Sequence, residues 1–429
     1  MTKFSRRKLF ISGAALSAVL GARLTGLAVA APDAQPDADL FILVFLRGGM
    51  DSLNLVVPYA DANYANNRPD IRIRPAGQTR GALDLNGYFG LHPAATHLRD
   101  LYTAGALAIV HAAGLIDPTR SHFDAMAMME RGTPGQTTTT AGWLTRHLAS
   151  VTGIGRTEVP VIVAQSEAPD SLLGYPNVAA ISSLSGYTYS GRWDQIDFQR
   201  LAMRTMYGSS SSWLYQAGAQ TLDVSDRLAL ASLSTYTPQF GAVYPSNGFG
   251  DSLKLAAQMI KADLGVRIAT LDLGGWDTHQ DQGNDGQGYF ATLTTTLSQG
   301  VHAFYTDMTD YVSKLTLVVM TEFGRRLSQN DSGGTDHGHG GVMLVVGGNV
   351  NKGIFGDWPG LQTDKLDEKR DLAITTDYRR VLSEILVRRL KNPKYSTVFP
   401  GFSDYRPLNL VKGSDAGVLR RGYLPLVVR

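Results

Sequence analysis

Unbroken apolar runs recur along the chain and predict strands that are buried on both faces. Leu40–Leu46 reads Leu-Phe-Ile-Leu-Val-Phe-Leu, without the alternation of polar and apolar residues that is typical of a half-exposed strand. Continuous runs of this length are typical of parallel sheets covered on both sides. Five more runs share this character: Leu107–His111, Val159–Ala164, Val266–Leu273, Leu315–Thr321 and Val342–Val346.

Helical patterns lie between these runs. Apolar residues recur at helical spacing in five segments: His92–Ala104, Ser121–Arg131, Ser252–Leu264, Phe290–Lys314 and Asp377–Leu390. Strands that alternate with helices predict an α/β fold with a mostly parallel central sheet. The stretch from Gly191 to Gly250 is richer in Ser, Tyr and Gln and is interpreted as a helical insertion or cap. No convincing linker divides residues 31–429, which are therefore expected to form one domain.

The first 30 residues have the pattern of an export signal. Ser-Arg-Arg-Lys-Leu-Phe at residues 5–10 is followed by a moderately apolar stretch, and Ala28-Val29-Ala30 offers a small-residue cleavage site. The paired arginines favour the twin-arginine type of signal, with a chance Arg-Arg in a general secretion signal as the alternative. We therefore expect a periplasmic or secreted protein that engages the twin-arginine translocation machinery.

Composition narrows the possible partners and ligands. The formal net charge of +2 comes from basic residues in the expected signal, which contains no acid, so the remainder is slightly acidic. Nothing in this balance predicts a nucleic-acid partner, and no later apolar run is long enough to span a bilayer. The chain has 0 cysteines, which excludes disulfides, thiolate metal ligands and cysteine nucleophiles.

Acidic and histidine residues follow or precede several of the predicted strands. Asp51 comes after Arg-Gly-Gly-Met at the end of the first strand. The remaining candidate ligands are Asp277, His279, Glu322, Asp336, His337 and His339. Parallel strands place their carboxyl ends along one edge of a sheet, so these residues are expected to gather there. Oxygen and imidazole ligands predict a divalent ion, zinc or manganese in the first place, with iron, calcium or magnesium as further possibilities; solvated polar turns are the alternative.

The segment Arg-Ser-His-Phe-Asp at residues 120–124 opens the helix after the second strand. Ser121 is placed at a helix N-terminus, where backbone N–H groups attract phosphate or sulfate, and a hydroxyl beside a metal can act as a nucleophile. Capping of the helix by Ser121 is an equally good interpretation. Arg120, His122 and Arg325 are candidate contacts for an anionic substrate, with surface salt bridges as the alternative for each arginine.

Five motifs together resemble a known family. They are Arg-Gly-Gly-Met-Asp-Ser-Leu-Asn, Arg-Ser-His-Phe-Asp, Gly-Gly-Trp-Asp-Thr-His, Thr-Glu-Phe-Gly-Arg and Gly-Thr-Asp-His-Gly. In this order, after an export signal, they resemble a bacterial family known only as domain of unknown function 1501. That family is similar to a distant branch of the alkaline phosphatase and sulfatase superfamily. The resemblance covers nearly all of the chain after the signal.

The resemblance implies a three-layer α/β/α fold of the alkaline phosphatase type. It also implies a hydrolase of small phosphate or sulfate esters, with Ser121 as nucleophile and metal ions shared among the listed acids and histidines. One departure concerns Glu322-Phe323, where the superfamily usually has an Asp-His pair, so that Asp336 or His122 would need to replace an imidazole. The alternative function is therefore an exported, non-catalytic binding or assembly protein with a structural metal or none.

Overall fold

The computed structural model describes residues 39–151, 159–176, 178–183, 194–230 and 236–418. The expected export signal at residues 1–30 lies outside the described residues, as do parts of the expected insertion. Among the helices of the described residues, none is both long and apolar enough to cross a membrane.

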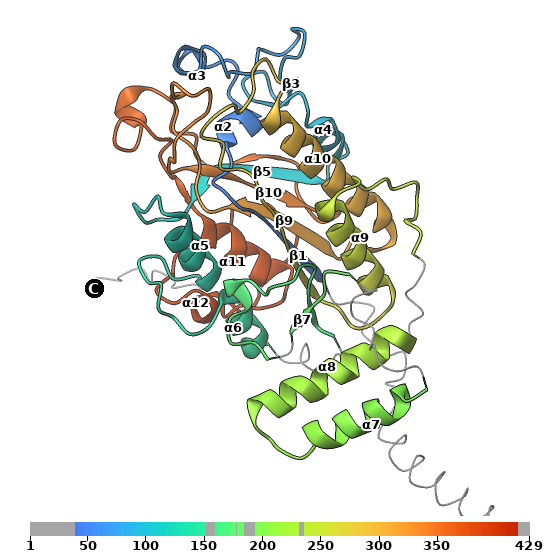
Figure 1. The fold of residues 1–429 in the computed structure, drawn as a ribbon. Coiled ribbons are helices and arrows are strands. Elements are labelled where there is room, and N and C mark those ends of the chain that lie inside the picture. The colour runs from blue at the N-terminus through green and yellow to red at the C-terminus, as the bar shows by residue number, and fades with distance from the viewer. Residues whose placement is uncertain (1–38, 152–158, 177, 184–193, 231–235, 419–429) are drawn as a thin grey trace, which may run out of the picture. The chain divides into compact units, whose positions relative to one another are not determined.

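A large central sheet confirms the predicted α/β class (Figure 1). Its strands follow the order β11-β5-β10-β9-β1-β8-β6-β7, with β12 paired to β5. Their bounds are β1 Leu40–Leu46, β5 Leu107–Gly114, β6 Val161–Val163, β7 Val178–Ala180, β8 Ile268–Leu273, β9 Leu315–Thr321, β10 Gly341–Val346, β11 Gly353–Phe355 and β12 Thr376–Asp377. A small second sheet joins β2 Val56–Val57, β4 Gly90–Leu91 and β3 Leu83–Asp84.

Strand β10 runs against its neighbours and thereby decides which loops meet. It pairs antiparallel with both β5 and β9, whereas β1 pairs parallel with β8 and β9. The amino end of β10 therefore lies at the same sheet edge as the carboxyl ends of β1, β8 and β9. Residues that precede β10 and residues that follow the parallel strands come together at this edge.

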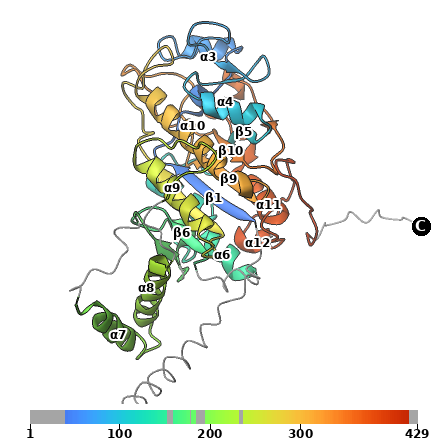
Figure 2. The same cartoon turned by 90° about the vertical axis from the view of Figure 1, so that its right-hand side faces the viewer.

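Helices cover both faces of the sheet (Figures 1 and 2). Alternate residues of β1 belong to different apolar clusters, Ile42 and Val44 to one and Leu43 and Phe45 to the other. The helices are α2 Ser52–Leu55, α3 Ala62–Asn67, α4 Thr96–Thr103, α5 His122–Arg131, α6 Trp143–Ser150, α7 Ile196–Tyr207, α8 Trp213–Leu230, α9 Gly248–Lys261, α10 Tyr289–Asp307, α11 Tyr378–Arg388 and α12 Tyr395–Val398. Helices α4, α9 and α10 contribute to the first cluster, and α5, α6 and α11 contribute to the second.

Element boundaries differ from prediction where local chemistry intervenes. Helix α4 begins at Thr96 and not at His92, because His92 precedes Pro93 and a residue before proline avoids the helical conformation. Helix α9 begins at Gly248, ahead of the predicted Ser252, because the Asn247 side chain accepts a hydrogen bond from Gly250 N and caps the helix. Within the expected insertion, α7 and α8 are linked by an ion pair of 2.8 Å between Arg204 and Asp223.

Candidate metal centre

Three imidazole rings converge on one carboxylate oxygen at the shared sheet edge. Asp277 Oδ1 lies 3.0 Å from His279 Nε2, 3.1 Å from His337 Nε2 and 3.4 Å from His122 Nε2. The Nε2 atoms of His279 and His337 are 2.9 Å apart. The residues come from the loop after β8, the loop before β10 and the first turn of α5, so the antiparallel strand β10 is required to bring His337 to the others.

Glycines allow the backbone to pack closely beneath this cluster. Gly48 has a φ of +120°, and a Cβ atom at this position would lie 2.5 Å from Asp277 N. A Cβ atom at Gly338 would lie 2.4 Å from the carbonyl carbon of Arg325. Larger residues at either position would push apart the loops that hold Asp277 and His337.

The second nitrogen of each ring is held by an oxygen acceptor outside the cluster. His122 Nδ1 lies 2.7 Å from Glu322 Oε1, and His337 Nδ1 donates to the Arg120 carbonyl oxygen at 2.9 Å. His279 Nδ1 lies 3.4 Å from Asp336 Oδ1. Metal-binding histidines characteristically donate their other N–H to a carboxylate or carbonyl in this way.

This anchoring leaves the Nε2 atoms without a hydrogen when the rings are neutral. Each lone pair then faces Asp277 Oδ1, which is also an acceptor, and acceptors repel each other at such distances unless a cation or proton lies between them. The Nε2 atom of His122 is buried without a hydrogen-bond partner. Asp277 Oδ1 and the Nε2 atoms of His122 and His337 all lie within 4.8 Å of one another, which fits a bound cation between them, and His279 Nε2 adjoins this group beside His337.

The charges around the cluster are set by buried groups. Burial would raise the pKa of Asp277, but the hydrogen bond and the positive charge of Arg325 outweigh it and lower that pKa to about 2. The hydrogen bond to Glu322 raises the pKa of His122, whereas burial lowers the pKa of His337. Asp277 is thus an ionised carboxylate at neutral pH and His337 is neutral, as metal ligands must be.

Arg325 ties Asp277 to the neighbouring backbone. Its side chain is wholly buried, and its Nη2 donates to Asp277 Oδ1 at 2.5 Å. Its Nε donates to the Gly49 carbonyl oxygen at 2.6 Å and its Nη1 to the Thr335 carbonyl oxygen at 2.8 Å. With its nitrogens bound to the protein, Arg325 positions Asp277 and is not placed to contact a substrate, the role expected from sequence.

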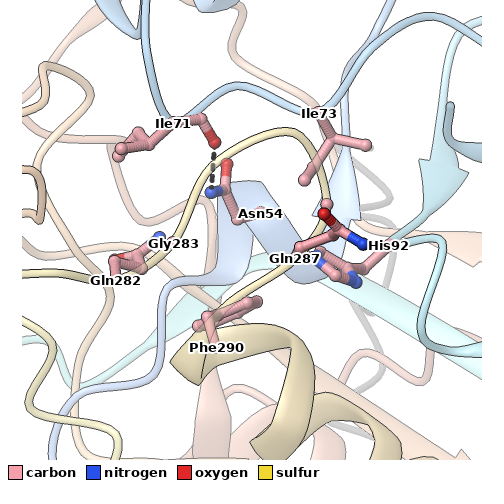
Figure 3. A pocket seen from close by; sticks show the side chains of 9 residues that line it. Asn54, Ile71, Ile73, His92, Gln282, Gly283, Gln287 and Phe290 are labelled. Atoms are coloured by element: carbon pink, nitrogen blue, oxygen red, sulfur yellow. Dashed lines mark hydrogen bonds between the residues drawn. The ribbon is translucent and has the colours of Figure 1, made fainter. Parts of the chain in front are cut away.

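Asp51 does not join the histidines. Its Oδ2 forms an ion pair of 2.6 Å with Arg68, and both side chains are wholly buried. Gln282 Nε2 donates to the same oxygen at 2.7 Å. Beside Gln282 lies a cavity of about 10 Å³ that is lined by Asn54, His92, Gln287 and Phe290 among others (Figure 3). A volume of this size holds one water at most.

The other residues predicted from sequence differ in their burial and in the protein groups that they contact. Glu322 is wholly buried and its Oε1 accepts from Gly48 N at 2.8 Å as well as contacting His122. His339 has Nδ1 2.9 Å from Asp367 Oδ2 and Nε2 3.1 Å from the Asp117 carbonyl oxygen, so both its nitrogens face other parts of the protein. The Arg120 side chain binds Asp371, with Nε donating to Oδ2 at 2.9 Å.

Ser121 is the N-cap of α5, and its Oγ accepts from Asp124 N at 3.4 Å. It stands in the chain between Arg120, whose carbonyl binds His337, and His122, whose ring is in the cluster. The backbone of Ser121 is therefore held between two residues that contact or belong to the centre.

Sequence reasoning did not single out Arg68 or Gln282. Their role depends on contacts with Asp51, which is 17 residues from Arg68 and 231 from Gln282 in the chain, and no local pattern marks such partners. Phe323, which replaces an expected histidine, packs against the cluster with ring centroids 4.8 Å from His122 and 4.9 Å from His337.

A family model described as "Protein of unknown function (DUF1501)" matches residues 105–391, more than half of the chain. The chain belongs to the DUF1501 family. The match includes every residue of the histidine cluster and excludes Asp51 and Arg68. No curated protein matches the chain. The DUF1501 assignment thus agrees with the resemblance that the five motifs carried.

Proposed function

We propose that this DUF1501 protein is an exported, metal-dependent hydrolase of small phosphate or sulfate esters. The observation that carries the proposal is the convergence of three Nε2 atoms on Asp277 Oδ1, with each Nδ1 atom anchored to an oxygen. Export is inferred from the signal pattern at residues 1–30. The central sheet with its centre at the carboxyl edge is compatible with an alkaline-phosphatase-like fold, which we include in the proposal.

The donor set favours a borderline transition metal. Three imidazole nitrogens and one carboxylate oxygen suit zinc or manganese, whereas calcium and magnesium prefer sites made of oxygen atoms alone. The side chains of Asp277 and His279 are 49% and 43% exposed, so one side of the centre is open to a ligand from solvent. Since Asp51 and His339 bind elsewhere, we infer one ion per centre and not the two that the superfamily usually has.

In this proposal each part of the centre has its own role in the reaction. A bound divalent ion would polarise the ester oxygen and assist ionisation of the attacking oxygen. Ser121 Oγ would give its proton to water and form a bond to phosphorus or sulfur, while the alcohol oxygen leaves with its electron pair and takes a proton from water. The N-terminus of α5 presents backbone N–H groups to the negative oxygens of the ester. Hydrolysis of the serine ester by water would then restore the enzyme.

Turnover of p-nitrophenyl phosphate and p-nitrophenyl sulfate tests this function. The protein is freed of metal with a chelator and assayed with zinc, manganese, calcium and magnesium in turn. We expect turnover with zinc or manganese, loss of it in His279→Ala, and loss of it in Ser121→Ala. Turnover that persists in Ser121→Ala would contradict the nucleophile and leave direct attack by water, while failure of all four metals would contradict the enzyme.

A second function is favoured by one specific feature. The hydroxyl of Ser121, the proposed nucleophile, is already used as the N-cap of α5. An exported binding or assembly protein with a structural ion would have this geometry. One tightly bound metal per chain in protein from its native host, without turnover on either ester, would support this alternative.

A further inference from the structure

Two histidines remain after the others are assigned to roles. The chain has nine histidines. Three form the candidate metal centre, and His339 has both nitrogens facing protein oxygens. Burial lowers the pKa of a further three, His92, His111 and His147, to about 4, which identifies them as neutral core residues. The remaining pair is His97 and His302.

This pair lies together on neighbouring helices that contribute no residue to the candidate metal centre. His97 is on α4 and His302 on α10, and their ring centroids are 5.0 Å apart. Asp100 is three residues after His97 on α4, so both side chains lie on the same face of the helix. One ligand atom from each of the three residues lies within 4.8 Å of the other two.

One of the ligand atoms is buried without a partner. His97 Nδ1 is enclosed and makes no hydrogen bond, with its nearest acidic neighbour, Asp100 Oδ2, at 3.6 Å. A buried imidazole nitrogen without a partner is costly. A cation between Asp100 and the two rings would supply the missing interaction.

The packing of the two helices fixes the pair. Leu98 N donates to Ser298 Oγ at 2.9 Å across the interface, and Leu98, Ser298 and Val301 are all wholly buried. His97 adjoins Leu98, and His302 adjoins Val301, so the two imidazoles are held by a rigid interface. Ligands held this way lose little conformational freedom when a metal binds.

We propose that His97, Asp100 and His302 form a second divalent-metal site that joins α4 to α10. Two imidazoles and one carboxylate select zinc-class ions over calcium or magnesium. The side chains of His97 and Asp100 are 43% and 64% exposed, so water completes the coordination and the ion exchanges with solvent. The bound ion would stabilise the helical layer on this face of the sheet.

Zinc titration of a protein without the first centre tests the second site. His279→Ala and His337→Ala are combined to remove the first centre, and the chelator-treated variant is titrated with zinc by calorimetry. We expect one zinc per chain and a higher melting temperature in its presence. Adding His302→Gln should weaken the affinity by more than about 100-fold, since the loss of a direct ligand exceeds the loss of an outer contact.

Two further variants separate this site from general surface binding. Asp100→Asn, at an exposed position that leaves the fold intact, should also weaken zinc binding, whereas His339→Gln in the same background should not. Absence of zinc binding in the background variant would overturn the proposal, and so would binding that His302→Gln and Asp100→Asn leave unchanged. Neither result bears on the hydrolase function, because the first centre has been removed.

Discussion

Asp51 and Asp277 follow neighbouring parallel strands, β1 and β8, yet the structure uses them in opposite ways. Asp51 is wholly buried and paired with Arg68, which is also wholly buried. Asp277 is 49% exposed, and its Oδ1 is approached by Arg325 and also by three imidazole nitrogens. An arginine partner is therefore common to both positions, and the imidazoles are what distinguish them.

The groups around a carboxylate distinguish a buried ion pair from a candidate metal-ligand site. The groups around Asp51 are donors, Arg68 and Gln282, and both bind its Oδ2, while its Oδ1 is buried without a hydrogen-bond partner. The groups around Asp277 include imidazole nitrogens whose lone pairs face it, and these are satisfied only by a cation or a proton. The first arrangement is that of a buried ion pair, while the second is the one that we propose to bind a metal ion.

The largest predicted effect is a loss of stability when Arg68 is replaced. Arg68→Met would leave Asp51 buried without its counter-ion, and we expect the free energy of unfolding to fall by about 3–5 kcal/mol. Arg72→Met, at an exposed arginine nearby, should change it by less than about 0.5 kcal/mol. Denaturation in urea measures both. Recovery of much of the loss in the double variant Asp51→Asn/Arg68→Met would show that the unpaired charge is the cause, and its persistence would show that packing is.

The Asp51 region should also lose stability in acid. Burial lowers the pKa of His92, beside Gln282, to about 4 from its ordinary value of 6.5. The unfolded chain therefore takes up a proton first as the pH falls, and up to about 3 kcal/mol of stability is lost between about pH 6.5 and pH 4. His92→Gln should flatten this part of the stability profile. An unchanged slope would assign the acid sensitivity to other groups.

Measurements of metal affinity should show which of the two aspartates, Asp51 or Asp277, lies beside a bound ion. His279→Ala removes a direct ligand at a partly exposed position and should weaken zinc or manganese binding by more than about 100-fold, with little change in stability. Asp51→Asn should leave the affinity unchanged. Competition with a fluorescent chelator measures both variants. Equal losses would mean that Asp51 belongs to the centre after all.

A smaller effect on metal affinity is expected for residues that contact the histidines and not the ion itself. Glu322→Gln removes the charge that orients His122 and should weaken metal binding by about 10–100-fold. Asp336→Asn is the matched comparison, because its contact with His279 is longer, 3.4 Å against 2.7 Å, and its side chain is 42% exposed. We expect the second loss to be smaller than the first. The reverse order would show that His279, and not His122, depends on its outer carboxylate.

The secondary structure was largely predictable because it depends on local patterns. Strands β1 and β9 have the bounds that their apolar runs predicted, and Ser121 caps α5 as an N-terminal serine was expected to. Helix α10 ends at Asp307, seven residues before the predicted Lys314, and a short 3-10 turn at Thr309–Tyr311 follows it. Apolar periodicity continues across such a break and does not reveal it.

The sequence by itself determined the strand ends at which acids and histidines would stand, and the family to which their motifs belong. Only the tertiary structure decided which of them meet. The antiparallel direction of β10 carries His337 to Asp277, Arg68 takes Asp51 into a buried ion pair, and Glu322 turns to the outer nitrogen of His122. These choices depend on the direction of side chains and on partners far away in the chain, which no local pattern encodes.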